Sequence, residues 1–463
     1  MTVLEALLRP RSIAIVGASR RPNKVGNIIL RNLLASGYRG KIYPVNPAAP
    51  EILGFKAYPS LRKVPGDVDM VVVAIPAEHV LQVVDEAAEK NAKVLVVISS
   101  GFSEVGRRDL EERLVRRARE KGIRVLGPNI FGVVYTPWGL NATFGPSMIL
   151  RGRIALITQS GALGVALMGW TSSIGVGLSA VVSVGNMADL GFDEISEVLA
   201  EDPETRVITL YIEGIKPGTG KRFIEKMRSV SLRKPVVAFK SGRTSRGSAA
   251  ASSHTGSLAG SDRVYQAAFE QSGVLRAMTL EEMFDWARAF AEQPLPRGNK
   301  IVIITNGGGV GVIATDAAEE QGLRLIDPPD DLVREFRKHM PWFGSARNPV
   351  DLTGMAAGPE YSGAVEAALK HPDVDGVIVL YCETGLVHPR DLAEALIETY
   401  RRVRDEGVEK PMLVSMIGGD ETNKALVHLD RRGIPAYPMP ERAVSAMAAM
   451  IRYKNWLDKA LPR

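Results

Sequence analysis

The sequence predicts an α/β protein with parallel sheets. Short apolar runs bounded by Gly or Pro alternate with helical patterns along the whole chain, which is typical of βαβ units. Long segments of the remaining two thirds of the chain repeat in order, which indicates a duplicated unit. The chain has 463 residues, and this length predicts about two to four domains.

The first third of the chain has the element order of a doubly wound nucleotide-binding fold. The expected strands cover residues 12–16, 41–45, 70–75, 94–98 and 124–126. The expected helices cover residues 25–36, 77–91 and 107–121. We therefore expect a Rossmann-like first domain over residues 1–145.

The rest of the chain contains two copies of one α/β unit. The matching segments are 154–165 with 301–312, 207–213 with 377–383, and 234–237 with 410–413. We expect the copies to form domains at 146–292 and 299–463, joined by a polar, Pro-rich linker. The first copy has a long loop of small residues around His254, whereas the second has only a short turn at 418–420.

Composition excludes several classes of protein. The content of 45% hydrophobic and 24% charged residues excludes a disordered or fibrous chain. The single cysteine, Cys382, excludes a disulfide framework and an all-thiolate metal site, and it is expected in the core. No apolar run reaches the roughly 18 residues of a membrane helix, and residues 1–10 lack a signal-peptide pattern. We therefore predict a cytoplasmic protein without a membrane partner. The net charge of +6 is modest, and no run of basic residues alternates with aromatic residues, so we predict no nucleic-acid partner.

The loop at residues 16–26 joins the first expected strand to the first expected helix and contains Gly17, Ser19 and Lys24. Glycines let the backbone approach a phosphate, which the helix N-terminus and the lysine then stabilise. The alternative is an ordinary tight turn between strand and helix. Asn46 follows the second strand where an NAD site requires a carboxylate, so an adenine nucleotide bound in another way is favoured.

Further polar positions follow other expected strands, at the edge where open α/β sheets bind ligands. They are Pro76, Ser99 and Asn129 in the first third, Gln159, Ser160 and Gly161 in the first copy, and Asn306, Gly307 and Gly308 in the second. The backbone N–H groups of the last two turns suit a phosphoryl group. The alternative role of Ser160 as a hydrolase nucleophile lacks the Gly that a nucleophile elbow has two positions earlier.

His254 is the candidate catalytic nucleophile. It lies in a run of Ser, Ala and Gly that cannot build a core around an imidazole. An imidazole with an ordinary pKa of about 6.5 is largely neutral at pH 7 and can accept a phosphoryl group. The alternative is a surface histidine or a general base.

Glu213 is the candidate partner of that imidazole. It ends an apolar strand and is followed by Gly214, so its carboxylate is expected at the same sheet edge. A carboxylate that accepts from one imidazole nitrogen leaves the other free to attack. The alternative is a solvated acid at a strand end. Its counterpart in the second copy, Glu383, has no histidine in a comparable loop and is expected to be structural.

These residues together resemble a known family. The segments are 16–19 (Val-Gly-Ala-Ser), 158–161 (Thr-Gln-Ser-Gly), 211–214 (Tyr-Ile-Glu-Gly), 252–257 (Ser-Ser-His-Thr-Gly-Ser) and 306–309 (Asn-Gly-Gly-Gly). Over essentially the whole chain they resemble the α subunits of ADP-forming acetyl-CoA synthetases, a group related to succinyl-CoA synthetase. The resemblance implies a Rossmann-like CoA-binding domain followed by two flavodoxin-like domains of the succinyl-CoA-synthetase type.

The resemblance also implies a reaction. The family converts acyl-CoA, ADP and phosphate into the free acid, CoA and ATP through an acyl phosphate and a phosphohistidine. Carried over, His254 is the phosphorylated residue, Glu213 stabilises it, and the turns at Gln159 and Asn306 bind phosphate. The residues implied in binding CoA or acetyl-CoA are Gly17, Ser19, Lys24, Asn46, Pro76, Ser99 and Asn129.

The resemblance implies a partner as well. Nothing in this chain is typical of an ATP-grasp module, which the family places on a β subunit, so ADP or ATP with Mg is expected there, in an α2β2 heterotetramer. No metal site is expected on this chain. Two other classes remain. A non-catalytic acyl-CoA-binding or regulatory subunit would have no use for His254 and Glu213. A CoA- or NAD-dependent oxidoreductase would need a ribose carboxylate and a hydride-transfer site, and the sequence shows neither.

Overall fold

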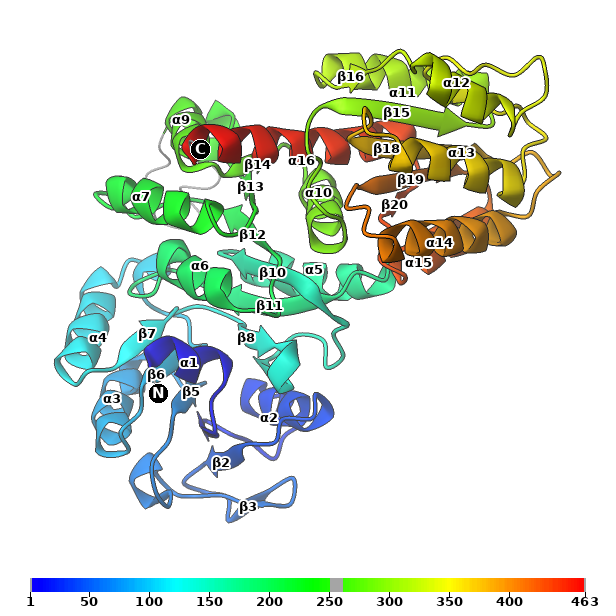
Figure 1. Ribbon diagram of the computed structural model, residues 1–463. Coiled ribbons are helices and arrows are strands. Elements are labelled where there is room, and N and C mark those ends of the chain that lie inside the picture. The colour runs from blue at the N-terminus through cyan, green and yellow to red at the C-terminus, as the bar shows by residue number, and fades with distance from the viewer. Residues whose placement is uncertain (1, 250–260, 462–463) are drawn as a thin grey trace. The chain divides into compact units, whose positions relative to one another are not determined.

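The chain forms two units, Met1–Ala277 and Met278–Arg463, in a computed structural model that describes residues 2–249 and 261–461. The first unit contains two large sheets and the second contains one (Figure 1). In these described ranges, no helix has both the length and the apolar character needed to cross a membrane. The observed fold is the α/β class with mostly parallel sheets, which confirms the predicted fold class.

The first sheet has the predicted doubly wound arrangement. Five parallel strands run in the order β2-β1-β5-β6-β7. They are β1 (Ser12–Val16), β2 (Lys41–Val45), β5 (Met70–Val73), β6 (Val94–Val97) and β7 (Arg124–Leu126), beside a small hairpin of β3 (Glu51–Ile52) and β4 (Phe55–Lys56). Two of the strands end one or two residues earlier than predicted, and the other three have the predicted bounds.

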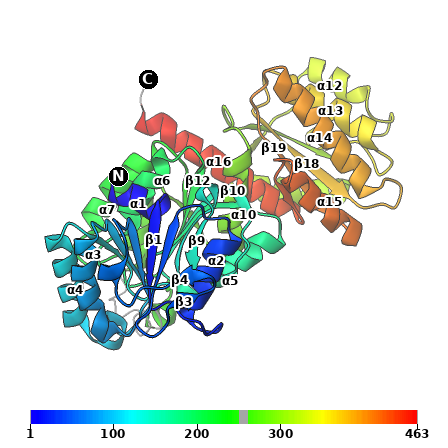
Figure 2. The ribbon, with the colours of Figure 1, turned by 90° about the horizontal axis from the view of Figure 1, so that it is seen from below.

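Helices cover both faces of this sheet (Figure 2). Helix α2 (Val25–Ala35) shares a buried cluster with Ile13 and Ile15 of β1, together with the short helix α1 (Val3–Leu8). Helices α3 (Val80–Glu89) and α4 (Arg108–Glu120) pack on the opposite face, where Ala14 and Val16 point. Side chains alternate between faces along a strand, so β1 is buried on both.

The second sheet has seven strands in the order β14-β13-β12-β10-β11-β8-β9. They are β8 (Gly132–Tyr135), β9 (Leu140–Thr143), β10 (Arg151–Thr158), β11 (Leu178–Ser183), β12 (Val207–Ile212), β13 (Val236–Lys240) and β14 (Leu275–Ala277). The helices between them are α5 (Gly161–Ser173), α6 (Phe192–Glu201), α7 (Gly220–Ser231) and α9 (Asp262–Ser272). The β8–β9 hairpin pairs antiparallel with β11, so it joins this sheet although it precedes residue 145.

One apolar core runs through both sheets of the first unit. It contains Ile15 and Val96 from the first sheet, Ile157 and Leu210 from the second, and Leu140 from the hairpin. Burial of apolar surface is the main source of stability, so a core that both sheets share fixes their relative position. This explains why the first unit extends as one body to Ala277.

The second unit repeats the topology of the second sheet. Its parallel strands run in the order β16-β15-β18-β19-β20, the same order as β11-β10-β12-β13-β14, with β17 also paired to β15. They are β15 (Lys300–Thr305), β16 (Arg324–Leu325), β17 (Val350–Asp351), β18 (Gly376–Cys382), β19 (Met412–Ile417) and β20 (Ala436–Tyr437). The helices are α11 (Gly308–Glu320), α12 (Asp330–Arg337), α13 (Gly358–Lys370), α14 (Pro389–Asp405), α15 (Asp420–Asp430) and α16 (Pro440–Ala460). The shared strand order agrees with the predicted repeat, but the register matches 207–213 with 376–382 and not with the predicted 377–383.

Helix α10 (Leu280–Glu292) ends the first copy in sequence but packs on α16 in the second unit. Thr279 caps its N-terminus by accepting from the Glu282 N–H at 3.0 Å. By its contacts this helix lies in the second unit, although the predicted domain 146–292 includes it. The hydrophobic period of α10 predicts a buried face, and a period carries no information about which sheet buries it.

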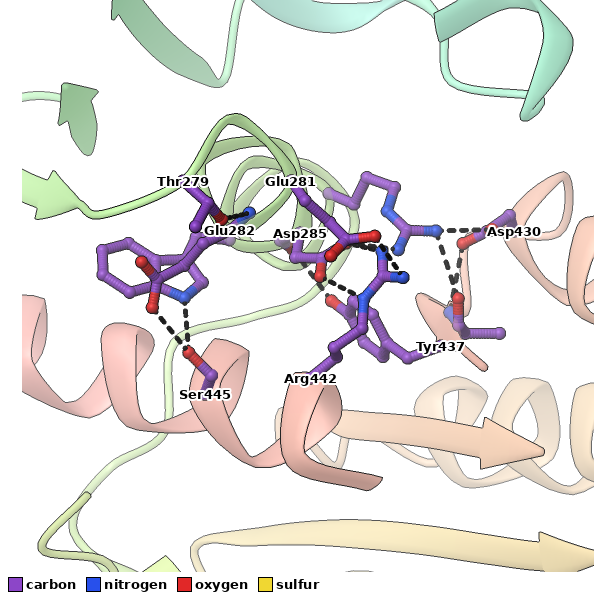
Figure 3. Close-up of polar contacts among 11 residues, drawn as sticks. Thr279, Glu281, Glu282, Asp285, Asp430, Tyr437, Arg442 and Ser445 are labelled. Carbon is purple, nitrogen blue, oxygen red and sulfur yellow. Dashed lines mark hydrogen bonds and ion pairs between the residues drawn. The ribbon is translucent and has the colours of Figure 1, made fainter. Parts of the chain in front are cut away.

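A buried ionic cluster joins α10 to α15, β20 and α16 (Figure 3). Arg288 donates to Asp285 and Asp430, both at 2.8 Å, and Arg442 donates to Asp285 at 2.6 Å. The Tyr437 hydroxyl donates to the Asp285 carbonyl at 2.9 Å. Burial lowers the pKa of Arg288, but the neighbouring charges of Asp430, Tyr437 and Asp285 outweigh it and hold that pKa above its ordinary value.

We predict that Arg288→Met destabilises the second unit by about 3–5 kcal/mol, because it leaves two buried carboxylates without their shared cation. Urea denaturation of the full chain measures the change. Arg390→Met, which removes an exposed ion pair with Glu394, is the control and should change the unfolding midpoint far less. Equal effects of the two variants would contradict the role given to the cluster.

Candidate functional site

The loop between β1 and α2 is held against its neighbours by glycines. Gly17 has a φ of +94°, and a Cβ there would lie 2.3 Å from the carbonyl oxygen of Ala74. A Cβ on Gly26 would lie 2.1 Å from the carbonyl oxygen of Gly17. The first turn of α2 therefore packs directly on the loop, and its N–H groups point to the space above the sheet edge.

An open cleft of about 410 Å³ lies over this loop, and we call it the loop cleft. Its lining includes Gly17, Ser19, Lys24 and Asn46. Lys24 is exposed at the N-cap of α2, whose first turn contains no acidic residue. The cleft thus combines a helix N-terminus with a cation, which suits an anionic ligand.

Two of the predicted ligands in the loop cleft brace the loop. The Asn46 amide donates to the carbonyl of Ala18 at 2.7 Å, and its oxygen accepts from the Ala48 N–H at 2.8 Å. The Ser19 hydroxyl accepts from the Arg21 N–H at 3.1 Å. These contacts fix the shape of the loop from within, so its backbone presents a preformed surface to a ligand.

A second open cleft of about 620 Å³, which we call the edge cleft, adjoins the loop cleft, because Val25 and Ala74 line both. Its lining includes Pro76, Ser99, Asn129, Gly161 and Ala162. The structure therefore brings the predicted CoA ligands of the first sheet to the N-terminus of α5 in the second sheet. All these residues lie in the first unit.

The turn before α5 is held by hydrogen bonds at its base. The Thr158 hydroxyl accepts from the Ser160 N–H at 3.1 Å, and Ser160 is an N-cap without a side-chain hydrogen bond to the helix. The Gln159 side-chain oxygen accepts from the N–H groups of Glu213 at 2.6 Å and Gly214 at 2.9 Å. Gln159 thus ties the end of β10 to the end of β12, and the first N–H groups of α5 remain for a ligand.

The second copy builds the same turn. The Thr305 hydroxyl accepts from the Gly307 N–H at 3.0 Å, and α11 begins at Gly308. The Asn306 side chain donates to the carbonyl of Cys382 at 2.9 Å and accepts from its N–H at 2.8 Å. Burial raises the pKa of the Cys382 thiol, which disfavours a reactive thiolate. Gln159 and Asn306 therefore have equivalent structural roles in the two units.

The strand register makes Cys382, and not Glu383 as predicted, the counterpart of Glu213, because Thr158 pairs with Tyr211 and Thr305 pairs with Leu380. Glu213 and Glu383 also differ in their surroundings. Glu213 directly follows β12 and is only 7% exposed. Glu383 is exposed, and its carboxylate accepts from the Gly419 N–H and the Thr422 hydroxyl, both at 2.7 Å. Those two donors hold the pKa of Glu383 below its ordinary value and cap α15. His254, the predicted partner of Glu213, lies outside the described residues.

Sequence reasoning missed Lys240, the last residue of β13, which is 1% exposed. The signal was present, because a lysine that ends an apolar strand aligns with Met416 in the second copy. Within residues 2–249 and 261–461, no group of three or more His, Cys, Asp or Glu side chains could hold a metal ion.

Comparison with known proteins divides the chain into three family segments. Residues 11–136 match a CoA binding domain, 151–290 a succinyl-CoA ligase like flavodoxin domain, and 301–460 a ligase-CoA domain. The α subunit of acetate–CoA ligase [ADP-forming] I from Pyrococcus furiosus is 53% identical over 98% of this chain and 99% of its own length. The chain belongs to the ADP-forming acetate–CoA ligase family. The predicted family is confirmed.

Two further proteins are similar to this chain over nearly its whole length. A solved structure of acetyl-coenzyme A synthetase 1 from Ca. Korarchaeum cryptofilum, in complex with phosphate and ADP, is 48% identical, with a TM-score of 0.96 and 99% of both chains covered. The acetate–CoA ligase [ADP-forming] from Methanocaldococcus jannaschii is 38% identical over 97% of this chain, which spans 63% of that protein. Some members of the family thus have a longer chain than this one.

We predict that Gly17→Val weakens CoA binding by about tenfold or more. A side chain at this positive φ, against Ala74, costs about 1–3 kcal/mol of strain or moves the loop, and about 1.4 kcal/mol is a factor of ten in affinity. Titration calorimetry with CoA measures the effect. Gly169→Ala in α5, where a new Cβ meets nothing within 4 Å, is the control. Equal affinity of both variants would exclude the loop cleft as the CoA site.

Proposed function

We propose that this chain is the catalytic α subunit of an ADP-forming acyl-CoA synthetase that converts acyl-CoA, ADP and phosphate into a free acid, CoA and ATP. Acetyl-CoA is the first substrate to test, because the relative with 53% identity is named an acetate–CoA ligase. The observation that carries the proposal is the adjoining pair of clefts, which connects the glycine loop after β1 to the N-terminus of α5. The same surface can therefore hold an acyl thioester and a phosphate next to each other.

The first step is formation of an acyl phosphate. A phosphate oxygen attacks the thioester carbonyl, the new C–O bond replaces the C–S bond, and the thiolate of CoA leaves and takes up a proton. The N–H groups at Gly161 and Ala162 border the edge cleft, where a helix N-terminus stabilises phosphate charge. Gly17, Ser19, Lys24, Asn46, Pro76, Ser99 and Asn129 are the residues that we propose surround CoA.

The second step moves the phosphoryl group to His254. The imidazole nitrogen forms a P–N bond, the bond from phosphorus to the acyl oxygen breaks, and the carboxylic acid leaves as its carboxylate. Glu213 accepts from the other imidazole nitrogen and stabilises the positive charge on the ring. The turns at Gln159, Ser160 and Gly161 and at Asn306, Gly307 and Gly308 are the proposed phosphate-binding elements.

The third step needs a partner. We propose an ATP-grasp β subunit that holds ADP with Mg and takes the phosphoryl group from His254, in an α2β2 heterotetramer. The Pyrococcus furiosus relative is named a subunit α, and the Methanocaldococcus jannaschii relative has a longer chain. Both facts support a division of the activity between two polypeptides. The cytoplasmic location stays a prediction of the sequence.

The alternative of a non-catalytic CoA-binding or regulatory subunit is not favoured. It accounts for the loop cleft but gives no reason for the burial of Glu213, whose main-chain N–H donates to the Gln159 side chain. The NAD-dependent alternative fails at Asn46, whose side chain braces the glycine loop where a carboxylate would bind a ribose.

We predict that the full chain gains one phosphoryl group when incubated with acetyl-CoA and inorganic phosphate, without nucleotide. Intact-mass analysis should show an added phosphoryl mass that is stable in alkali and labile in acid, as expected for a phosphohistidine. His254→Ala should show no added mass and should bind CoA with unchanged affinity. A wild-type chain that stays unlabelled, also with the partner subunit and ATP present, would favour the regulatory alternative.

We predict that Glu213→Gln lowers the phosphorylated fraction of the chain by about tenfold or more, because a neutral amide stabilises an imidazolium poorly. The control is Glu383→Gln, at the residue that directly follows β18 in the second unit. Its carboxylate caps α15, so this variant should change only the unfolding midpoint. Equal loss of phosphorylation in both variants would exclude a specific role of Glu213.

A further inference from the structure

Lys240 has a buried ammonium group that has no role in the three proposed steps. Its side chain is 1% exposed, and its ammonium donates to the carbonyl oxygen of Ser241, the next residue along the chain. The ammonium also lies 4.6 Å from the centre of the Tyr265 ring, a cation–π contact. In the part of the chain that the structure describes, Lys240 forms no ion pair. A lysine is seldom buried without a carboxylate partner, so this one requires a reason.

Lys240 lies at the same sheet edge as Glu213. Lys240 of β13 is paired in register with Ile212 of β12, and Glu213 is the residue that follows. The Tyr265 hydroxyl accepts from the Ile215 N–H at 3.0 Å, and the Ser241 N–H donates to the carbonyl of Ile212 at 3.0 Å. The two residues that the ammonium contacts, Ser241 and Tyr265, therefore hydrogen-bond to the main chain on either side of Glu213.

Burial and three charged neighbours together set the pKa of Lys240. Burial lowers the pKa of Lys240, the carboxylate of Asp262 opposes this effect, Arg276 adds to it, and Glu213 opposes it. Asp262 is itself paired with Arg276 at 2.5 Å.

The second copy of the unit provides an internal comparison. Met416 occupies the position of Lys240 and is also 1% exposed, so the same place in the fold accepts an apolar side chain of similar length. By the strand register Cys382 occupies the position of Glu213, because Thr158 pairs with Tyr211 and Thr305 pairs with Leu380. The second copy therefore lacks both the carboxylate and the cation at these two positions.

The proposed phosphohistidine explains why only the first copy has a cation at this position. A phosphoryl group brings about two negative charges to a sheet edge that already contains the buried Glu213 carboxylate. Like charges in a poorly solvated site repel strongly, and a nearby cation offsets that repulsion. The second copy has no histidine loop and receives no such group, so it has no use for the cation.

We propose that Lys240 is a positioning residue for phosphoryl transfer, whose buried ammonium offsets the combined negative charge of Glu213 and the phosphoryl group. The inference rests on the proposed function. It assigns the ammonium no bond to phosphorus and no proton transfer. The ammonium keeps the strand ends at Ser241 and Glu213 in place and makes the phosphorylated state of the chain more stable.

The test measures the phosphorylated fraction of the full chain with its partner subunit and ATP, by intact mass. Lys240→Met should lower this fraction by about tenfold, whereas Lys240→Arg, which keeps the charge, should restore most of it. Lys240→Gln keeps a donor for Ser241 without the charge and should behave like Lys240→Met. CoA affinity should stay unchanged in all three variants, which shows that the first unit is folded.

Lys234→Met is the matched control. Lys234 lies at the opposite end of the same strand, its ammonium donates to the carbonyls of Leu199 and Asp202, and burial likewise lowers its pKa. This variant should leave the phosphorylated fraction at the wild-type level. Normal phosphorylation of Lys240→Met, or an equal loss in the methionine and arginine variants, would overturn the inference and leave the proposed function intact. An unlabelled wild type would overturn both.

Discussion

The geometry of the site depends on one interaction that both copies of the unit contain. An amide side chain at the end of the first strand hydrogen-bonds to the main chain at the end of the neighbouring strand. Gln159 accepts from the N–H groups of Glu213 and Gly214, and Asn306 binds both main-chain groups of Cys382. Parallel strands end at one edge, so this link sets the spacing between a helix N-terminus and the residue after the next strand. The amides that the sequence marks as phosphate ligands therefore act first as braces.

The two copies share a scaffold but differ at the proposed catalytic positions. Both copies keep the strand order, the threonine that closes the turn and the bracing amide. They differ at the residue whose N–H this amide binds, which is the buried Glu213 in the first copy and Cys382 in the second. A buried carboxylate costs free energy unless other groups stabilise its charge, so it persists where a function requires it. The pair of Lys240 and Met416 follows the same division.

Much of the fold follows from patterns that are local in sequence. Apolar runs between glycines located the strands, and the repeated order of those runs predicted the shared topology. The β8–β9 hairpin and helix α10 could not be assigned, because periodicity predicts a buried face without identifying the element that covers it. The residues at the sheet edge could be predicted from the strand ends, because open α/β sheets bind ligands at the carboxyl ends of their strands. The bracing roles of Asn46 and Gln159 depend on hydrogen bonds across distant segments, which no local pattern encodes.

The core that the two sheets of the first unit share has a consequence for catalysis. Side chains of β1 and β10 belong to one buried cluster, so the loop cleft and the N-terminus of α5 are held on one rigid body. A thioester in one cleft and a phosphate in the other can then react without a domain motion, which lowers the entropic cost of bringing them together. In the proposed reaction the phosphoryl group, by contrast, has to reach a nucleotide that we place on another polypeptide. A rigid site for the first step and a histidine in a loop of small residues for the last match these two different requirements.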